Sequence, residues 1–173
     1  VFNSLIILFL ILYFASPQMP QETVTKVGIG SQIGLVLDRS ASMDDPFSGS
    51  TQLDNEGVGE TKSAAAARLI INFVESRKND MIGVITFSNS AMFVLPLTQN
   101  KSAITGAVNA TAGNALFQTN IGAGLSSVSE LFAKVEDSGS RAVILLSDGA
   151  GRIDAPTQQK IRDWFDRFDI GLY

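Results

Sequence analysis

The chain has 173 residues, enough for one domain with a sizeable core and a short additional segment. Its 13 basic and 17 acidic residues give a net charge of −4, so no excess of positive charge points to nucleic acid as a partner. Cysteine and histidine are both absent, which excludes disulfides and thiolate chemistry, removes the usual zinc ligands and argues against a serine hydrolase.

Residues 1–16 are predicted to form a transmembrane helix. No charged or strongly polar side chain occurs from Leu5 until Ser16. Because a spanning helix needs about 20 apolar residues and the chain begins with valine, we expect this helix to start further upstream. A secretory signal is the alternative, but no basic region precedes the apolar run, and Pro17 follows the small residues at once.

Residues 17–28 are rich in Pro, Gln, Glu, Thr and Lys and are predicted to be a linker, because proline stops the preceding helix. Glu22 and Lys26 are its only charged residues. Cytoplasmic flanks of membrane helices normally carry an excess of Lys and Arg, so their scarcity favours a domain outside the cytoplasm. Residues 29–173 are expected to form that domain.

The strongest pattern begins at Ile33, where an apolar run stops at Asp38 and continues as Asp-x-Ser-x-Ser, with Ser40 and Ser42. The run lacks polar alternation, which predicts a central strand covered on both faces. Its carboxyl end is where open α/β sheets place ligands. One carboxylate and two hydroxyls suit Mg²⁺ or Mn²⁺, but water, other loops or a partner must complete the shell.

Residues 44–60, which follow, are rich in Gly, Ser and acidic residues and are predicted to be an exposed loop. We interpret its carboxylates as a solvated acidic surface, with a second cation site as the alternative. These carboxylates belong to Asp44, Asp45, Asp54 and Glu56.

A helix is predicted over residues 62–77. Its buried side chains are expected to be Leu69, Ile70, Phe73 and Val74. Strands over residues 81–87 and 91–95 follow, and the tight turn between them requires antiparallel pairing. Because Pro96 cannot donate to a ladder, we expect the second of these strands to lie at the edge of the sheet and to end there.

A weak helix over residues 102–110 precedes Thr119, whose simplest role is to cap a helix that begins near Ile121.

An apolar strand over residues 142–146 ends at Ser-Asp148-Gly149, which alone would indicate only a turn. This segment repeats the pattern that ends at Asp38, a buried strand followed by an aspartate. The two carboxylates, of Asp38 and Asp148, are therefore predicted to lie at one crevice. A helix capped by Thr157 and a strand from Asp169 come last. The alternation of strands and helices predicts a doubly wound, mostly parallel α/β sheet with one antiparallel edge strand.

Three of these segments, in the same order, resemble the metal-ion-dependent adhesion site of von Willebrand factor A domains. They are Asp38-x-Ser40-x-Ser42, the run that begins with Thr119, and the run that ends with Asp148-Gly149. One departure is Phe117-Gln118 before the threonine, where the family commonly has glycine. The resemblance implies this family's fold for residues 29–173, with the C-terminal part of the domain missing.

The resemblance also implies that Ser40, Ser42 and Thr119 contact Mg²⁺, or Mn²⁺ or Ca²⁺ in its place. Asp38 and Asp148 would act close by, mostly through water. An open coordination position would then take a Glu or Asp carboxylate from a protein partner, so no catalytic residue is expected. The residues implied to contact this partner are Met43, Asp44, Asn120 and Gly149.

An apolar helix followed by such a domain resembles the bacterial Bat-type membrane proteins that accompany MoxR-type ATPases. This implies a single-pass or multi-pass protein of the bacterial inner membrane, with its domain in the periplasm and a role in assembling or activating a protein complex. Other proteins of the family and a MoxR-type ATPase system are the implied partners, besides the lipid bilayer. A scaffold subunit that keeps the metal motif as a folding element is the second hypothesis. Metal-assisted hydrolysis with Asp38 or Asp148 as the base is the third.

Overall fold

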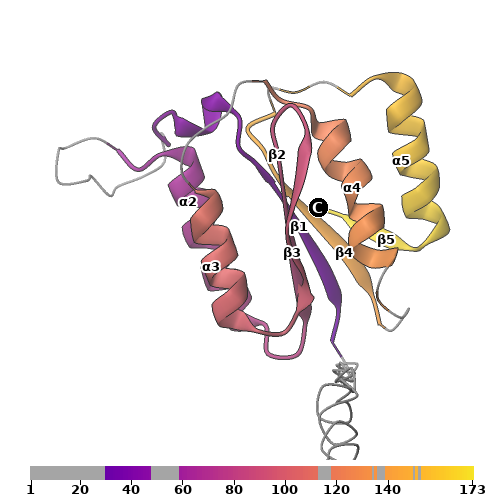
Figure 1. Ribbon diagram of the computed structural model, residues 1–173, viewed down its shortest axis with the longest axis horizontal. Coiled ribbons are helices and arrows are strands. Elements are labelled where there is room, and N and C mark those ends of the chain that lie inside the picture. Colours follow the sequence, from indigo (N-terminus) through magenta and orange to yellow (C-terminus); the bar gives the residue numbers. More distant parts are fainter. Residues whose placement is uncertain are drawn as a thin grey trace, which may run out of the picture.

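The computed structural model describes residues 30–47, 59–112, 118–133, 135, 139–149, 151 and 153–173. It contains a five-stranded sheet in the order β3-β2-β1-β4-β5 (Figure 1). The strands are β1 (Gln32–Asp38), β2 (Met81–Phe87), β3 (Ala91–Thr98), β4 (Arg141–Leu146) and β5 (Ile170–Leu172). Only the β2–β3 pair is antiparallel, so the predicted fold class is confirmed for the domain.

The predicted transmembrane segment and linker, residues 1–28, lie outside the described residues. Within the described ranges, no helix has the length and apolar character needed to cross a membrane.

Strand β1 is the central strand, as its apolar run predicts. It pairs in parallel with β2 on one side and with β4 on the other, and all seven of its residues are buried. Asp38, its last residue, is opposite Phe87 of β2, and Leu37 is opposite Leu146 of β4. The carboxyl ends of these three strands therefore lie side by side at one edge of the sheet.

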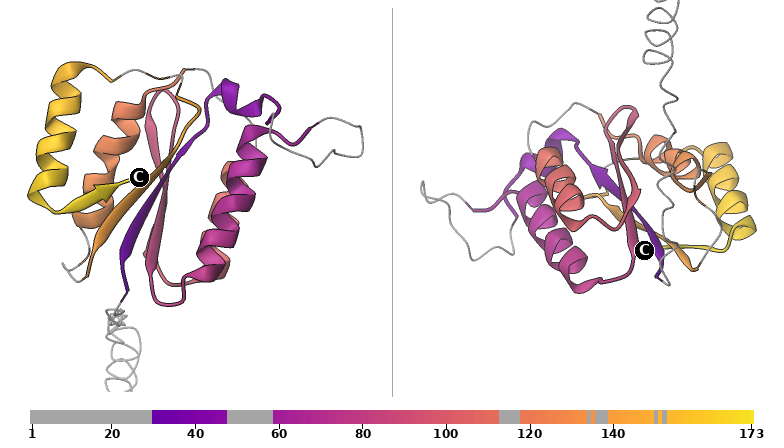
Figure 2. Two further views of the ribbon diagram at one scale, coloured as in Figure 1. Left: turned by 180° about the vertical axis from the view of Figure 1, so that it is seen from behind. Right: turned by 60° about the horizontal axis from the view of Figure 1, so that its bottom comes forward.

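Two helices cover each face of the sheet (Figure 2). On one face are α2 (Lys62–Ser76) and α3 (Lys101–Thr111), and on the other are α4 (Ile121–Ala133) and α5 (Ala155–Arg167). Side chains alternate across a strand, so Leu35 of β1 packs in the core beneath α2 and α3, whereas Val36 packs beneath α4. This alternation buries both faces of β1.

Strand β3 is at the edge of the sheet, as predicted, but it continues through Pro96 to Thr98 instead of ending before the proline. Register shifts on either side of Val84 interrupt its pairing with β2. An edge strand tolerates the missing donor of a proline because one side of its backbone has no neighbouring strand. The prediction that the strand ends at Pro96 was therefore wrong.

The cap of the last helix also differs from the prediction. Thr157 is not the N-cap of α5; Asp154 is, and its Oδ2 accepts a hydrogen bond of 3.0 Å from the backbone N–H of Thr157. Hydrogen bonds from the Thr157 side chain and backbone hold the pKa of Asp154 below its usual value. Pro156 in the first turn lacks the N–H that would need a partner there, which favours this start.

Of the side chains predicted to be buried in α2, Ile70 and Val74 are buried, Phe73 is only partly buried, and Leu69 is 54% exposed. Leu69 lines an open groove of about 500 Å³ whose walls also include Ala65, Leu145 and Leu146. Helical periodicity placed Leu69 on the apolar stripe of α2. It could not indicate that this flank of the stripe faces a groove instead of the sheet.

Candidate metal centre

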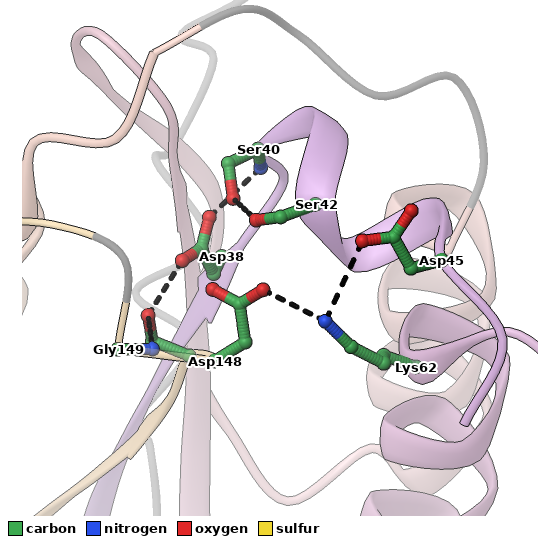
Figure 3. A network of polar contacts seen from close by, with 8 residues as sticks. Asp38, Ser40, Ser42, Asp45, Lys62, Asp148 and Gly149 are labelled. Carbon is green, nitrogen blue, oxygen red and sulfur yellow. Dashed lines mark hydrogen bonds and ion pairs between the residues drawn. The ribbon is translucent and has the colours of Figure 1, made fainter. Parts of the chain in front are cut away.

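Asp38 ends β1 with a side chain that is only 4% exposed and is held at both oxygens. Its Oδ1 accepts a hydrogen bond of 2.8 Å from the backbone N–H of Ser40. Its Oδ2 accepts one of 2.6 Å from the hydroxyl of Ser147, which follows the neighbouring strand β4 (Figure 3). These bonds fix the carboxylate in one orientation at the carboxyl edge of the sheet.

The hydroxyls of Ser40 and Ser42 lie together above this carboxylate. Ser40 is 2% exposed and immediately precedes a 3-10 helix, η1 (Ala41–Asp44), which turns the chain so that the two Oγ atoms are 3.1 Å apart. Neighbouring ligands of an octahedral Mg²⁺ at 2.0–2.1 Å are separated by about 3 Å. The two hydroxyls form a hydrogen bond with each other, and their separation is also close to that of two adjacent oxygen ligands of one small hard cation.

Asp148 follows β4 and forms an ion pair with Lys62, a residue that was not predicted to be part of the site. The Nζ atom of Lys62, in the first turn of α2, is 3.0 Å from Asp148 Oδ2 and 3.7 Å from Asp45 Oδ2 (Figure 3). The pKa of Lys62 is raised, first by its hydrogen bond to Asp148 and then by the charges of the two carboxylates. Ser147 was likewise not predicted to take part in the site, although it directly precedes Asp148 in the sequence motif.

Thr119 enters the same edge of the sheet from the side of β2. The backbone N–H of Asn120 donates a 2.6 Å hydrogen bond to the carbonyl of Ser88, the residue after β2, and the N–H of Arg39 donates one of 2.8 Å to the carbonyl of Phe87. The loops after β1 and before α4 are therefore anchored to adjacent carbonyl groups. Asp38, Ser40 and Ser42 are joined by hydrogen bonds, and Asp148 lies beside them in its own ion pair with Lys62 (Figure 3). The Thr119 backbone lies beside the strand that borders these residues.

The predicted capping role of Thr119 belongs to its neighbour. Asn120 Oδ1 accepts a 3.0 Å hydrogen bond from the backbone N–H of Ala123, so Asn120 caps α4. Before the threonine, Gln118 has φ +75°, the left-handed region that glycine adopts most readily. Gln118 therefore takes a conformation that is easier for glycine, at a cost of about 1 kcal/mol or more in backbone strain.

Among the residues implied to contact a partner, Asp44, Asn120 and Gly149 are exposed, whereas Met43 is only 5% exposed. In the acidic loop, Asp45 pairs with Lys62, whereas Asp54 and Glu56 lie outside the described residues. Across the described part of the chain, no three His, Cys, Asp or Glu side chains are grouped as metal ligands. The donors that do gather are hydroxyls and two carboxylates, which fit Mg²⁺, Mn²⁺ or Ca²⁺ better than zinc.

We expect Gly151→Ala to weaken Mn²⁺ binding about tenfold without unfolding the domain. A β-carbon at Gly151 would lie 2.9 Å from Thr119 Cγ2 and 2.9 Å from Ile121 Cγ1, so these side chains or the Gly151 backbone must shift, and we expect the shift to displace Thr119. Calorimetric titration with Mn²⁺ measures the affinity, and circular dichroism confirms the fold. Gly59→Ala is the control, because nothing lies within 4 Å of the β-carbon it adds. Equal affinity in both variants would show that the position of Thr119 does not matter to the ion.

Comparison with known proteins agrees with this geometry. A family model described as the von Willebrand factor type A domain matches residues 33–150, which include the three motif segments. An uncharacterized protein of Borreliella burgdorferi is 24% identical over 163 residues, covering 92% of this chain and 44% of that protein. The chain thus spans less than half the length of this curated relative.

Solved structures share the fold. An aerotolerance-related membrane protein of Bacteroides fragilis and BatB of Bacteroides thetaiotaomicron each match 83% of this chain with a TM-score of 0.63 and 21% identity, over 65% and 64% of their own chains. Proximal thread matrix protein 1 of the mussel byssus, solved with a zinc-occupied metal-ion-dependent adhesion motif, matches 86% of this chain and 36% of its own, with 20% identity and a TM-score of 0.61. The match over residues 33–150, with the sheet order and the motif segments at its carboxyl edge, shows that this chain belongs to the von Willebrand factor type A domain family.

Proposed function

We propose that this chain is a membrane-tethered protein-binding module that depends on a divalent cation. The ion would be held by the hydroxyls of Ser40, Ser42 and Thr119, with Asp38 and Asp148 close by. The observation that carries the proposal is the 3.1 Å separation of the Ser40 and Ser42 hydroxyl oxygens above a buried, fixed carboxylate. Two neutral oxygens at this spacing suit two adjacent ligands of one small hard cation.

The charges of the described site explain why a partner would supply a carboxylate. Asp38 and Asp148 contribute two negative charges, and the positive charge of Lys62, 3.0 Å from Asp148 and 3.7 Å from the more exposed Asp45, offsets part of the charge of these two partners. A divalent ion held mainly by neutral hydroxyls would keep part of its charge uncompensated. A Glu or Asp side chain of a partner then both fills an open coordination position and neutralises the remaining charge. In this role the ion is a bridge between proteins, and no bond is broken.

The proposed organisation is a transmembrane helix in residues 1–16, a linker in residues 17–28 and the adhesion domain in residues 29–173. The protein would lie in the bacterial inner membrane with the domain in the periplasm. Its role would be to assemble or activate a protein complex with other proteins of the family or with a MoxR-type ATPase system. The apolar N-terminal sequence and the likeness to a Bacteroides membrane protein support this arrangement.

We expect Thr119→Ala to weaken Mn²⁺ binding by about 10- to 100-fold. The helix should remain intact because Asn120, not Thr119, caps it. The measurement is calorimetric titration of the full 173-residue chain in a mild detergent, with Thr105→Ala on α3 as the control for loss of a threonine away from the site. No binding of Mg²⁺ or Mn²⁺ by the folded wild-type chain would refute the proposed function.

A scaffold subunit is the second candidate, and one observation favours it. The polar network is already closed by protein groups, because Asp38 is bonded at both oxygens and Asp148 is paired with Lys62. A network of this kind can stabilise the fold without an ion. Native gel electrophoresis of membranes with and without chelator separates the two candidates. A complex that keeps its size after the metal is removed indicates a scaffold, and one that dissociates indicates adhesion through the ion.

A further inference from the structure

Lys62 occupies a position that its own helix disfavours. It is the first residue of α2, directly after the N-cap Thr61, whose side chain accepts a hydrogen bond from the N–H of Ala64. The N-terminus of a helix carries partial positive charge, so acidic residues are favoured in the first turn and a lysine is opposed. The described first turn of α2 contains no acidic residue. The reason for a cation at this position must therefore be sought outside the helix.

The partners of Lys62 supply that reason. Its ammonium group is 3.0 Å from Asp148 Oδ2 and 3.7 Å from Asp45 Oδ2. The Asp148 side chain is 14% exposed and that of Lys62 is 31% exposed, but Asp148 as a whole residue is exposed, so water still screens the pair in part. In Figure 3, Asp148 lies between Lys62 on one side and Asp38 on the other. One carboxylate is thus shared between the lysine and the proposed cation site.

We propose that Lys62 is an internal competitor of the divalent cation, which holds Asp148 in the metal-free protein and lowers the affinity of the site. This inference rests on the proposed function. A bound divalent ion near Asp148 would meet a fixed positive charge, and like charges a few ångströms apart oppose each other even under partial solvent screening. The ion must also share the Asp148 carboxylate with the ammonium group.

Competition by Lys62 would make the retention of the metal ion depend on an acidic partner. With Lys62 present, its ammonium group offsets part of the negative charge of Asp148 and of the more exposed Asp45. The carboxylates near the site then do not fully balance a divalent ion, so the ion is retained best when a partner adds an acidic group. Without Lys62, the ion would be held more firmly by the chain alone. The lysine therefore couples the retention of metal to the presence of an acidic partner, which suits a reversible bridge.

The test is calorimetric titration of the full chain with Mn²⁺ for three variants. We expect Lys62→Met to bind Mn²⁺ roughly tenfold more tightly than the wild type, because removing a unit charge near a divalent ion changes its binding by about that factor. Lys62→Arg keeps the charge and should stay within about threefold of the wild type. Arg68→Met, which removes a charge from the same helix where it pairs with Glu60, is the matched control and should leave the affinity unchanged.

Each outcome of this experiment has a distinct meaning. Weaker or unchanged Mn²⁺ binding by Lys62→Met would overturn the inference, because the lysine would then orient Asp148 for the ion or leave the ion unaffected, instead of competing with it. Equal tightening in Lys62→Met and Arg68→Met would also overturn it, by assigning the effect to net charge alone. The proposed function fails separately, if the wild-type chain binds no Mn²⁺ at all. Circular dichroism of the metal-free variants confirms that each is folded.

Discussion

Replacing Asp38 with asparagine is expected to weaken Mn²⁺ binding by about 100-fold or more while leaving the domain folded. The substitution removes one of two carboxylates beside the proposed ion but hardly changes the shape of the side chain. The amide oxygen can still accept from the N–H of Ser40, and the hydroxyl of Ser147 can rotate to accept from the new amide group. Calorimetric titration measures the affinity, and urea unfolding measures the stability.

Asp38→Ala separates the electrostatic role of this residue from its structural role. Without a side-chain acceptor, the N–H of Ser40, a residue only 2% exposed, loses its partner, as does the hydroxyl of Ser147. Each lost partner costs about 1–3 kcal/mol when the group stays buried. We therefore expect the alanine variant to lose stability as well as metal binding. If the asparagine variant bound Mn²⁺ as tightly as the wild type, Asp38 would have only a structural role.

The second large effect is expected at Gly124, where α4 crosses the sheet. A β-carbon at this position would lie 2.8 Å from the ring of Phe87 in β2 and 3.1 Å from Val36 Cγ1 in β1. Both neighbours are buried in the core and cannot move without disturbing their own packing. We expect Gly124→Ala to lower the free energy of unfolding by about 2 kcal/mol, because the overpacking outweighs the better helix propensity of alanine. Urea unfolding of the full chain measures this change.

Gly106 offers a matched control for this prediction. It lies within α3, is exposed, and has nothing within 4 Å of the position where a β-carbon would be added. Gly106→Ala should therefore raise the free energy of unfolding by about 0.5–1 kcal/mol through helix propensity alone. Opposite signs at the two positions are the expected result. A stabilised Gly124→Ala would mean that α4 lies further from the sheet than the structure has it.

The elements were predictable from sequence where local signals are strong. Continuous apolar runs identified β1, β2 and β4, and the short turn after Phe87 identified the antiparallel edge strand. Caps were less predictable because several polar residues stand near each helix start and any of them can accept the bond. Thus Asn120 caps α4 where Thr119 was expected, and Asp154 caps α5 where Thr157 was expected.

The sequence by itself determined the family and the fold class, because motif spacing and apolar periodicity are local properties of the chain. It also identified Asp38, Ser40 and Ser42 at the end of β1 and Asp148 after β4, but not Ser147. Only the tertiary structure decided which of these groups meet. Ser147 reaches Asp38 across 109 residues and Lys62 reaches Asp148 across 86 residues. Such contacts follow from the adjacency of β1 and β4 and from the position of α2 beside them, which depend on how apolar faces pack together over the whole domain.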